Sequence, residues 1–277
     1  YDMAFAGDRI WLVGDMGAVL HSPDAGRTWR HQLGGPTRLH GAHPVFRGVE
    51  FVNDSEGWAV GEFGTILHTQ NAGATWVEQS ATGALLSGLC FVDANRGWAA
   101  GDRGEMLATT DGGATWSQRA SICDLTGKSR LVRLQSGKLL ACVQNIKAGP
   151  YKTFYIAESM DGGVTWINPR EALVGQTPTT AGMLKLADGR VLLQFLRDAQ
   201  PGKSGSASWY AGCGMRAVIS ADEGKTWQDE VYYLDFTTFT GSYNGSVVLD
   251  DDLILSVVGS SQAGNSWKKV KNHTDFY

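Results

Sequence analysis

Short apolar runs alternate with glycine-rich turns along the whole sequence, and no convincing stretch carries the periodicity of an amphipathic helix. Runs such as GAVLH, GTILH, GEMLA, FYIAE and RAVIS end at a turn, and extended stretches such as WRHQL and WVEQS follow it. Apolar runs of this kind, bounded by glycine, are typical of β-strands joined in hairpins. The pattern therefore predicts an all-β protein.

One segment recurs at the turn that follows five of these runs. It reads SPDAGRTW at 22–29, TQNAGATW at 69–76, TTDGGATW at 109–116, SMDGGVTW at 159–166 and SADEGKTW at 220–227. The glycine at its fifth position can adopt a positive φ, and the Asp or Asn at its third position can accept hydrogen bonds from turn amides. We therefore interpret these carboxylates as parts of a turn rather than as catalytic groups. We expect the Trp that ends each segment to fill the space between neighbouring sheets.

A repeat of about 40–60 residues indicates stacked or radially arranged units. Each unit reads as three strands, the recurrent segment and an outer strand, as in FRGVEFV, GWAVGEF, GTILHT and WVEQS. A closed ring of four-stranded sheets hides strand edges, and the large Trp-bearing units favour it over a linear β-solenoid. We predict a single all-β domain, a β-propeller of about six blades with Asp-box hairpins and an incomplete last blade. The predicted blades span residues 1–33, 45–80, 86–120, 129–168, 181–230 and 243–272.

Composition narrows the possible functions. The 277 residues include 36 Gly and 10 Trp, and the net charge of −4 is spread along the chain. This charge disfavours a nucleic-acid groove, and no apolar run is long enough for a membrane span. The four cysteines lack metal-ligand spacing and the H-G-A-H sequence at 40–43 lacks further ligands, so we predict neither a metal nor a cofactor. No signal peptide precedes YDMAFAGD, so the sequence leaves the compartment open, as it does the oligomeric state.

Residues 46–118 resemble the propellers of photosystem II assembly factors. The stretch that carries the resemblance is VFRGVEFVNDSEGWAVGEFGTILHTQNAGATW, and it includes Arg47. Members of that family are non-catalytic, lie in the lumen or outside the cytoplasm, and bind protein partners. The resemblance implies a binding role for Arg47 and an extracytoplasmic or secreted location.

Residues 129–259 are similar to the sialidase superfamily, whose propellers carry BNR or Asp-box repeats. The stretch LADGRVLLQFLRD places Arg197 at one of that family's carboxylate-binding arginines, and SYNGSVVLDDD places Tyr243 at its catalytic tyrosine. The resemblance implies an exo-acting glycoside hydrolase on acidic sugars, with Tyr243 as the nucleophile. Arg197, Arg216 and Arg47 are the candidates that hold the substrate carboxylate, because a guanidinium can grip a carboxylate through two hydrogen bonds.

Two departures from the sialidase pattern bear on catalysis. In that family a glutamate that assists the tyrosine is expected near Thr180, where this chain reads TPTTAG. The family's F-R-I-P sequence is also absent, and FRGV at 46–49 matches only its first two residues. A phenol needs a nearby base or positive surroundings to attack at neutral pH. The candidate acids that remain are Asp102 and Asp198.

The Gly- and Ser-rich stretch DAQPGKSGSASWYAGCGM carries Trp209 and Tyr210, which can stack on a sugar or anchor a protein partner. We favour a non-catalytic scaffold that binds a glycan or a protein through the mouth of the channel and this loop. The alternatives are the sialidase-like hydrolase and an assembly factor that binds a segment of a membrane protein. All three act on a carbohydrate or protein ligand, without nucleic acid and without membrane insertion.

Overall fold

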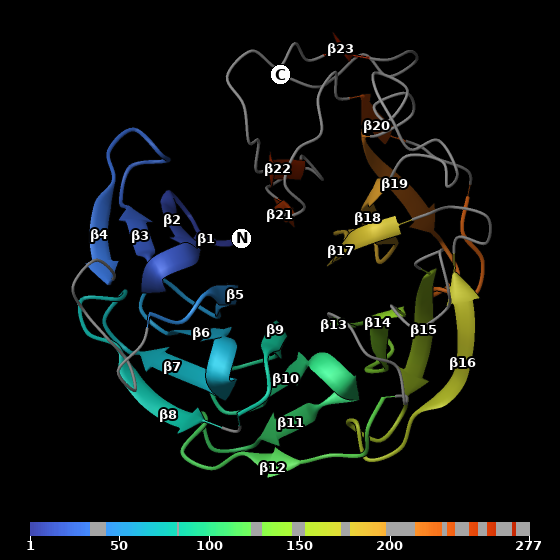
Figure 1. The fold of residues 1–277 in the computed structure, drawn as a ribbon, viewed down its shortest axis with the longest axis horizontal. Coiled ribbons are helices and arrows are strands. Elements are labelled where there is room, and N and C mark those ends of the chain that lie inside the picture. Colours follow the sequence, from blue (N-terminus) through green and yellow to red (C-terminus); the bar gives the residue numbers. More distant parts are fainter. Residues whose placement is uncertain are drawn as a thin grey trace, which may run out of the picture.

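The computed structural model describes residues 1–33, 43–81, 83–122, 129–145, 153–172, 178–197, 214–228, 232–235, 244–248, 254–258 and 268–269. In these residues the protein is all-β, apart from three short 3-10 turns. The sheets stand around a central axis like the blades of a propeller (Figure 1). The all-β prediction is therefore confirmed.

Five blades are formed by strands that pair in chain order from the axis outwards. Their bounds are β1 (Asp2–Ala6), β2 (Arg9–Val13), β3 (Val19–Ser22) and β4 (Arg30–Leu33); β5 (Phe46–Phe51), β6 (Gly57–Gly61), β7 (Thr65–Thr69) and β8 (Val77–Ala81); β9 (Leu86–Phe91), β10 (Gly97–Gly101), β11 (Met106–Thr109) and β12 (Ser117–Gln118); β13 (Ser129–Arg133), β14 (Leu139–Asn145), β15 (Thr153–Ser159) and β16 (Ile167–Ala172); and β17 (Pro178–Lys185), β18 (Val191–Arg197), β19 (Gly214–Ser220) and β20 (Tyr232–Asp235). Neighbouring strands within a blade are antiparallel, and β23 (Lys268–Lys269) pairs with β20.

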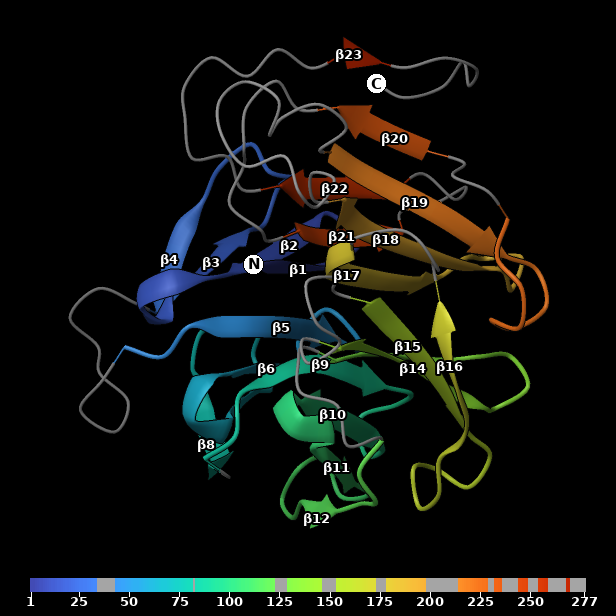
Figure 2. The ribbon, with the colours of Figure 1, turned by 45° about the vertical axis from the view of Figure 1, so that its right-hand side comes forward.

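A two-stranded sheet lies between the fifth and first blades. It consists of β21 (Asn244–Val248) and β22 (Ile254–Val258), and β21 contacts both β17 and β1 (Figure 2). The structure thus contains five blades and this strand pair within its described residues.

The recurrent segments join the third and fourth strands of the five blades. In the first, Asp24 Oδ1 accepts a hydrogen bond of 2.7 Å from the Thr28 amide, and Asp24 Oδ2 accepts one of 2.7 Å from the Thr28 hydroxyl. The Ser22 hydroxyl accepts a bond of 2.8 Å from the Gly26 amide. These bonds occupy the carboxylate within its own turn, as expected for a turn-forming residue.

The space between the first blades is filled by tryptophans of the second strands. Trp11 and Trp58 are completely buried, and Trp58 stacks on Phe91 of the next blade with ring centroids 3.7 Å apart. The tryptophans of the recurrent segments pack at the outer edge of these clusters, and Trp29 is 40% exposed. Trp76 and Trp116 therefore fill part of this space, as expected, and the second-strand tryptophans occupy its centre.

The fourth and fifth blades share a large apolar cluster, and charged side chains add a second connection between them. Lys138 Nζ lies 3.0 Å from Glu158 Oε2 and 3.2 Å from Glu223 Oε2, and Lys138 and Glu158 are both buried. Arg170 Nη1 contacts the other Glu158 oxygen at 2.7 Å. Two cations thus surround the buried Glu158 carboxylate, which keeps its pKa below the ordinary value although burial raises it.

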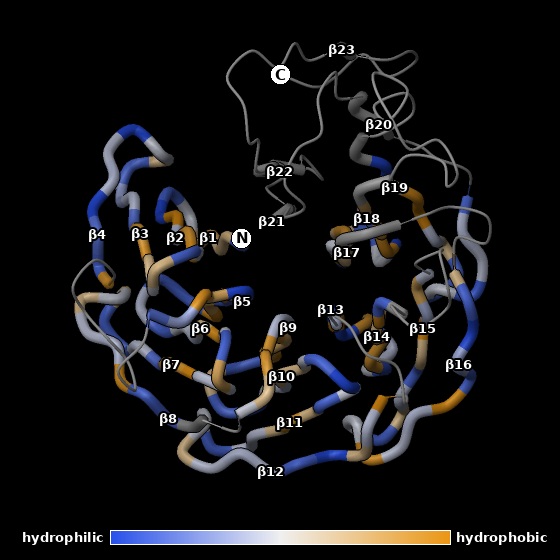
Figure 3. Tube along the Cα trace, viewed as in Figure 1, coloured by the Kyte–Doolittle hydropathy of each residue, from blue (hydrophilic) through white to orange (hydrophobic). Residues whose placement is uncertain are grey.

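The outer strands are the hydrophilic edge of the ring (Figure 3). The described residues of β4 and β12 are exposed or half-buried, and most of β16 is exposed. The inner and second strands carry most of the buried apolar residues, so the core lies between blades and close to the axis.

Candidate functional site

In the first three blades the connections between second and third strands lie at one face of the propeller, which we call the turn face. They are the 3-10 turns η1 (Asp15–Gly17), η2 (Glu62–Gly64) and η3 (Asp102–Gly104), drawn as coiled ribbons in Figure 1. The recurrent segments lie at the opposite ends of the third strands. The two faces therefore present different residues.

The middle residue of each 3-10 turn has an uncommon backbone conformation. Met16, Phe63 and Arg103 have φ angles of 57°, 60° and 59°. Left-handed backbone is strained for bulky L-residues, at a cost on the order of 1–3 kcal/mol. Met16 is nevertheless 59% exposed and Phe63 is 49% exposed. Two neighbouring blades therefore hold a large apolar side chain in solvent at the turn face.

Arg47 lies beside these turns, near the start of the inner strand β5. Its guanidinium carbon is 4.4 Å from the centre of the Tyr1 ring, and its Nη2 is 3.8 Å from Glu62 Oε1. The Tyr1 hydroxyl donates a hydrogen bond of 2.7 Å to Asp15 Oδ2. A cation, two carboxylates and a phenol thus connect η1, η2 and β5 at the turn face.

The other predicted site residues are spread over several blades. Asp102 opens η3 in the third blade. Arg197 ends β18, where its backbone lies opposite Gly214, and Arg216 is buried in β19. Arg197 and Arg216 therefore share the fifth blade, whereas Arg47 belongs to the second.

Four predicted residues lie outside the described residues, namely Asp198, Trp209, Tyr210 and Tyr243. Their roles stay predictions. The described backbone ends at Arg197 and resumes at Gly214, and β21 begins at Asn244, directly after Tyr243.

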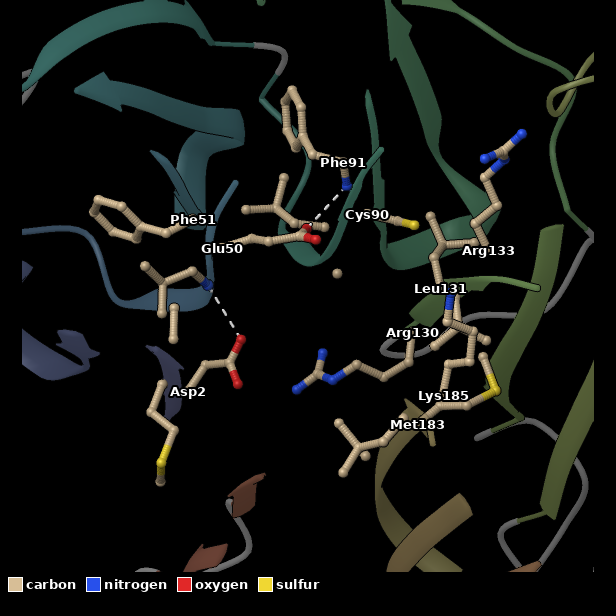
Figure 4. Close-up of a pocket in the computed structure, with 18 of the residues that line it drawn as sticks. Asp2, Glu50, Phe51, Cys90, Phe91, Arg130, Leu131, Arg133, Met183 and Lys185 are labelled. Carbon is tan, nitrogen blue, oxygen red and sulfur yellow. Dashed lines mark hydrogen bonds between the residues drawn. The ribbon is translucent and has the colours of Figure 1, made fainter. Parts of the chain in front are cut away.

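A cavity of about 480 Å³ occupies the channel between the inner strands of all five blades (Figure 4). Three of its charged residues escaped the sequence analysis, namely Asp2, Glu50 and Arg130. Each lies on an inner strand directly beside a buried apolar residue, and a charge at such a position is the signal that could have identified them. In the blade register Asp2 and Arg130 occupy the position at which the second and third blades have Gly48 and Gly88.

The two carboxyl groups are held by the strand of the next blade. Asp2 Oδ2 accepts a hydrogen bond of 3.1 Å from the Val49 amide, and Glu50 Oε2 accepts one of 3.0 Å from the Phe91 amide. Burial raises the pKa of Asp2 and raises the pKa of Glu50 to about 7. Both side chains retain some access to the cavity, and the low-dielectric walls explain why burial dominates both shifts.

Arg130 projects into the cavity from β13, and its guanidinium faces the Asp2 carboxyl group (Figure 4). Its Nη1 donates to the carbonyl oxygens of Ser87 and Ser129. Burial lowers the pKa of Arg130, and the negative Asp2 opposes that shift. The channel can therefore present a carboxylate acceptor, a carboxyl group that titrates near neutral pH, and a guanidinium donor to one ligand.

The first third of the chain matches a known family. Residues 1–88 match the profile described as photosynthesis system II assembly factor YCF48. The chain is a β-propeller with a YCF48-like first third. Among curated proteins, none matches.

Several solved structures have a similar fold. A structure of YCF48 bound to D1 peptide is 21% identical, with a TM-score of 0.55 over 83% of this chain and 67% of that one. A protein of unknown function from Dyadobacter fermentans is 17% identical, with a TM-score of 0.64 over 96% of this chain and 91% of that one. The GH74 enzyme of Niastella koreensis is 16% identical, with a TM-score of 0.56 over 82% of this chain and 37% of that one. At these identities the likeness shows the fold.

None of the helical turns in the described residues is long and apolar enough to cross a membrane. Within the same residues, no group of three or more His, Cys, Asp or Glu side chains is placed to bind a metal ion.

Proposed function

We propose that this propeller is a non-catalytic scaffold that binds a segment of a partner protein on its turn face. The observation that carries the proposal is the pair Met16 and Phe63, two large apolar side chains that are more than half and about half exposed on strained backbone. Exposed apolar residues that are grouped on one face mark interaction sites.

The backbone strain at Met16 and Phe63 supports a binding role for their exposed side chains. Glycine populates left-handed backbone without a steric penalty, so a glycine at either position would relieve strain. A phenylalanine there costs stability and gains little from burial within its own chain. Strained backbone of this kind collects at binding sites, where the side chain contributes to recognition.

The comparisons support a protein ligand. Both residues lie within the part that matches the YCF48 profile, as does Arg47, and one of the related solved structures is described as YCF48 bound to D1 peptide. Arg47 is 9% exposed and contacts Glu62 and Tyr1, so its proposed role is to support the turns that present the apolar pair. An extracytoplasmic location is part of this proposal.

Binding of a fluorescent D1 peptide, followed by anisotropy, tests the proposal. We expect Phe63→Gly and Met16→Gly each to weaken binding about tenfold, a typical loss for an apolar anchor. The same variants should unfold at higher denaturant concentration than the parent chain, since they remove strain. Met160→Ser is the matched control, because Met160 is 67% exposed on the opposite face. Unchanged binding by both glycine variants would refute the proposal.

A sialidase-like hydrolase is the alternative, and one observation favours it. Asp2 and Glu50 place two carboxyl groups with raised pKa values in the channel, and a carboxyl group that titrates near pH 7 suits a general acid. By resemblance Tyr243 would be the nucleophile, with Arg197 and Arg216 on the substrate carboxylate. Hydrolysis of a fluorogenic sialoside that disappears in Tyr243→Phe would establish this activity.

Glycan binding without hydrolysis is tested separately. Trp209 and Tyr210 are the proposed stacking residues, whereas Asp102 and Asp198 are the candidate acids of the hydrolase alternative. Retention of the protein on a glycan array that is lost in Trp209→Ala would indicate that the ligand is a carbohydrate and not a protein.

We also infer that β21 and β22 belong to a sixth blade and that the recurrent segments are Asp-box hairpins. The contacts of β21 with both β17 and β1, and the hydrogen bonds that Asp24 accepts within its segment, support these assignments.

A further inference from the structure

The channel cavity has the size and lining of a small-molecule site, independently of the turn face. Its volume of about 480 Å³ lies within the range of ligand pockets, about 300–1,000 Å³. Apolar side chains line much of it, and the charged groups come from different blades (Figure 4). A ligand that bridges these groups would contact several blades at once.

The acidic side of the cavity is formed by the first and second blades. One oxygen of Asp2 and one of Glu50 each accept a backbone amide of the next blade, at 3.1 and 3.0 Å. These bonds fix the orientation of both groups. A carboxylate can accept about four hydrogen bonds in all, so each group retains acceptor capacity toward the cavity.

The basic side is formed by the fourth blade. Arg130 Nη1 is engaged by the carbonyl oxygens of Ser87 and Ser129, which holds the guanidinium plane in place. A guanidinium carries five N–H donors, so a group anchored through one nitrogen can still grip a carboxylate. In Figure 4 this guanidinium faces Asp2 across the open space.

Opposite charges on two sides of one cavity select a ligand with the complementary arrangement. We propose that the channel binds a small zwitterion, with its ammonium group against Asp2 and Glu50 and its carboxylate on Arg130. The Asp2 carboxylate would repel a lone anion on Arg130, and the Arg130 guanidinium would repel a lone cation on Asp2, because these two groups interact electrostatically across the cavity. A ligand that carries both charges compensates each repulsion with an attraction.

The protonation state of Glu50 provides a measurable sign of zwitterion binding. Its pKa of about 7 means that a large fraction of Glu50 is protonated near neutral pH. An ammonium group beside it would lower that pKa and release a proton. Binding of the zwitterion near pH 6.5 should therefore be coupled to proton release.

Calorimetry with four probes tests the site, namely glycine, γ-aminobutyrate, acetate and ethylammonium. We expect at least one zwitterion to bind about tenfold more tightly than both singly charged probes, as for a charge-assisted contact. Titration in two buffers of different ionisation enthalpy should show proton release with the parent chain, and none with Glu50→Gln. Binding of acetate or ethylammonium as tight as that of both zwitterions would overturn the proposal, and so would no binding by any probe.

Substitutions in the channel test whether the zwitterion binds there. Asp2→Asn keeps an oxygen for the Val49 amide, and Arg130→Lys keeps a positive charge, so both preserve much of the local structure. Each should weaken zwitterion binding about tenfold, because each removes one charge-assisted contact. Lys225→Gln is the control, since Lys225 is exposed and is not among the residues that line the cavity. Unchanged affinity in both Asp2→Asn and Arg130→Lys would place the ligand elsewhere and refute the site.

Discussion

The indole Nε1 of Trp58 donates a hydrogen bond of 3.2 Å to the carbonyl oxygen of Gly112, and so ties the second blade to the recurrent segment of the third. Trp11 makes the same bond to Ala72 at 3.1 Å, and Trp98 makes it to Gly162 at 2.8 Å. The recurrent segment is thus more than a hairpin turn, because it presents an acceptor to the preceding blade.

Replacement of Trp58 by Phe tests how much this contact contributes. The variant loses the indole hydrogen bond and part of a completely buried side chain, so we expect the free energy of unfolding to fall by about 1–3 kcal/mol. Urea unfolding measures the change. Trp29→Phe is the control, because Trp29 is 40% exposed, and its effect should stay under about 1 kcal/mol. Similar losses in the two variants would contradict the distinction between them.

The repeat was sufficient to predict the all-β propeller, because each unit carries its own strand and turn signals. It could not decide which tryptophan lies at the centre of the space between blades, since both Trp58 and Trp76 recur at fixed positions and spacing does not give orientation. The channel site was missed for a different reason. Asp2 and Arg130 belong to the first and fourth blades, and only closure of the ring brings them face to face.

The inner strands of the third and fourth blades approach so closely at Gly88 that we expect a larger residue there to destabilise the fold. A Cβ atom there would lie 2.8 Å from the Ser129 carbonyl oxygen and 3.3 Å from the Arg130 Cα, both backbone atoms that cannot move independently. We expect Gly88→Ala to destabilise the fold by about 1–3 kcal/mol. Gly14→Ala should be tolerated, since the nearest atoms to its Cβ would be 3.9 Å away. Thermal unfolding of both variants checks this, and a stable Gly88→Ala protein would show that the strands can separate.

The carboxylates of the recurrent segments predict a loss of stability in acid. Hydrogen bonds from the Thr28 and Thr165 side chains hold the pKa of Asp24 and of Asp161 at about 2. Because these folded-state pKa values lie below the ordinary value of about 3.9, the stabilisation is present above that value and is lost as the pH falls toward 2. Carboxyl NMR titration measures the pKa values directly. Thr165→Val should raise the pKa of Asp161 and leave that of Asp24 unchanged, and equal shifts at both sites would refute the local cause.

For Glu50 we expect the opposite effect, a loss of folding stability as the pH rises. Its pKa of about 7 lies above the ordinary value, so its contribution to stability is full below about pH 4.3 and is lost as the pH rises through 7. A difference of this size corresponds to roughly 3–4 kcal/mol at about 1.4 kcal/mol per pH unit.

Replacement of Glu50 by Gln isolates this effect. Glutamine keeps an oxygen for the Phe91 amide, which donates at 3.0 Å, but it cannot ionise. Relative to the parent chain, the variant should gain roughly 2–3 kcal/mol of stability between pH 5 and pH 8 in urea unfolding. Asp2 opposes ionisation of Glu50 through its own negative charge, so Asp2→Asn should lower the pKa of Glu50. A stability difference between Glu50→Gln and the parent that does not change from pH 5 to pH 8 would show that Glu50 ionises normally in the folded channel.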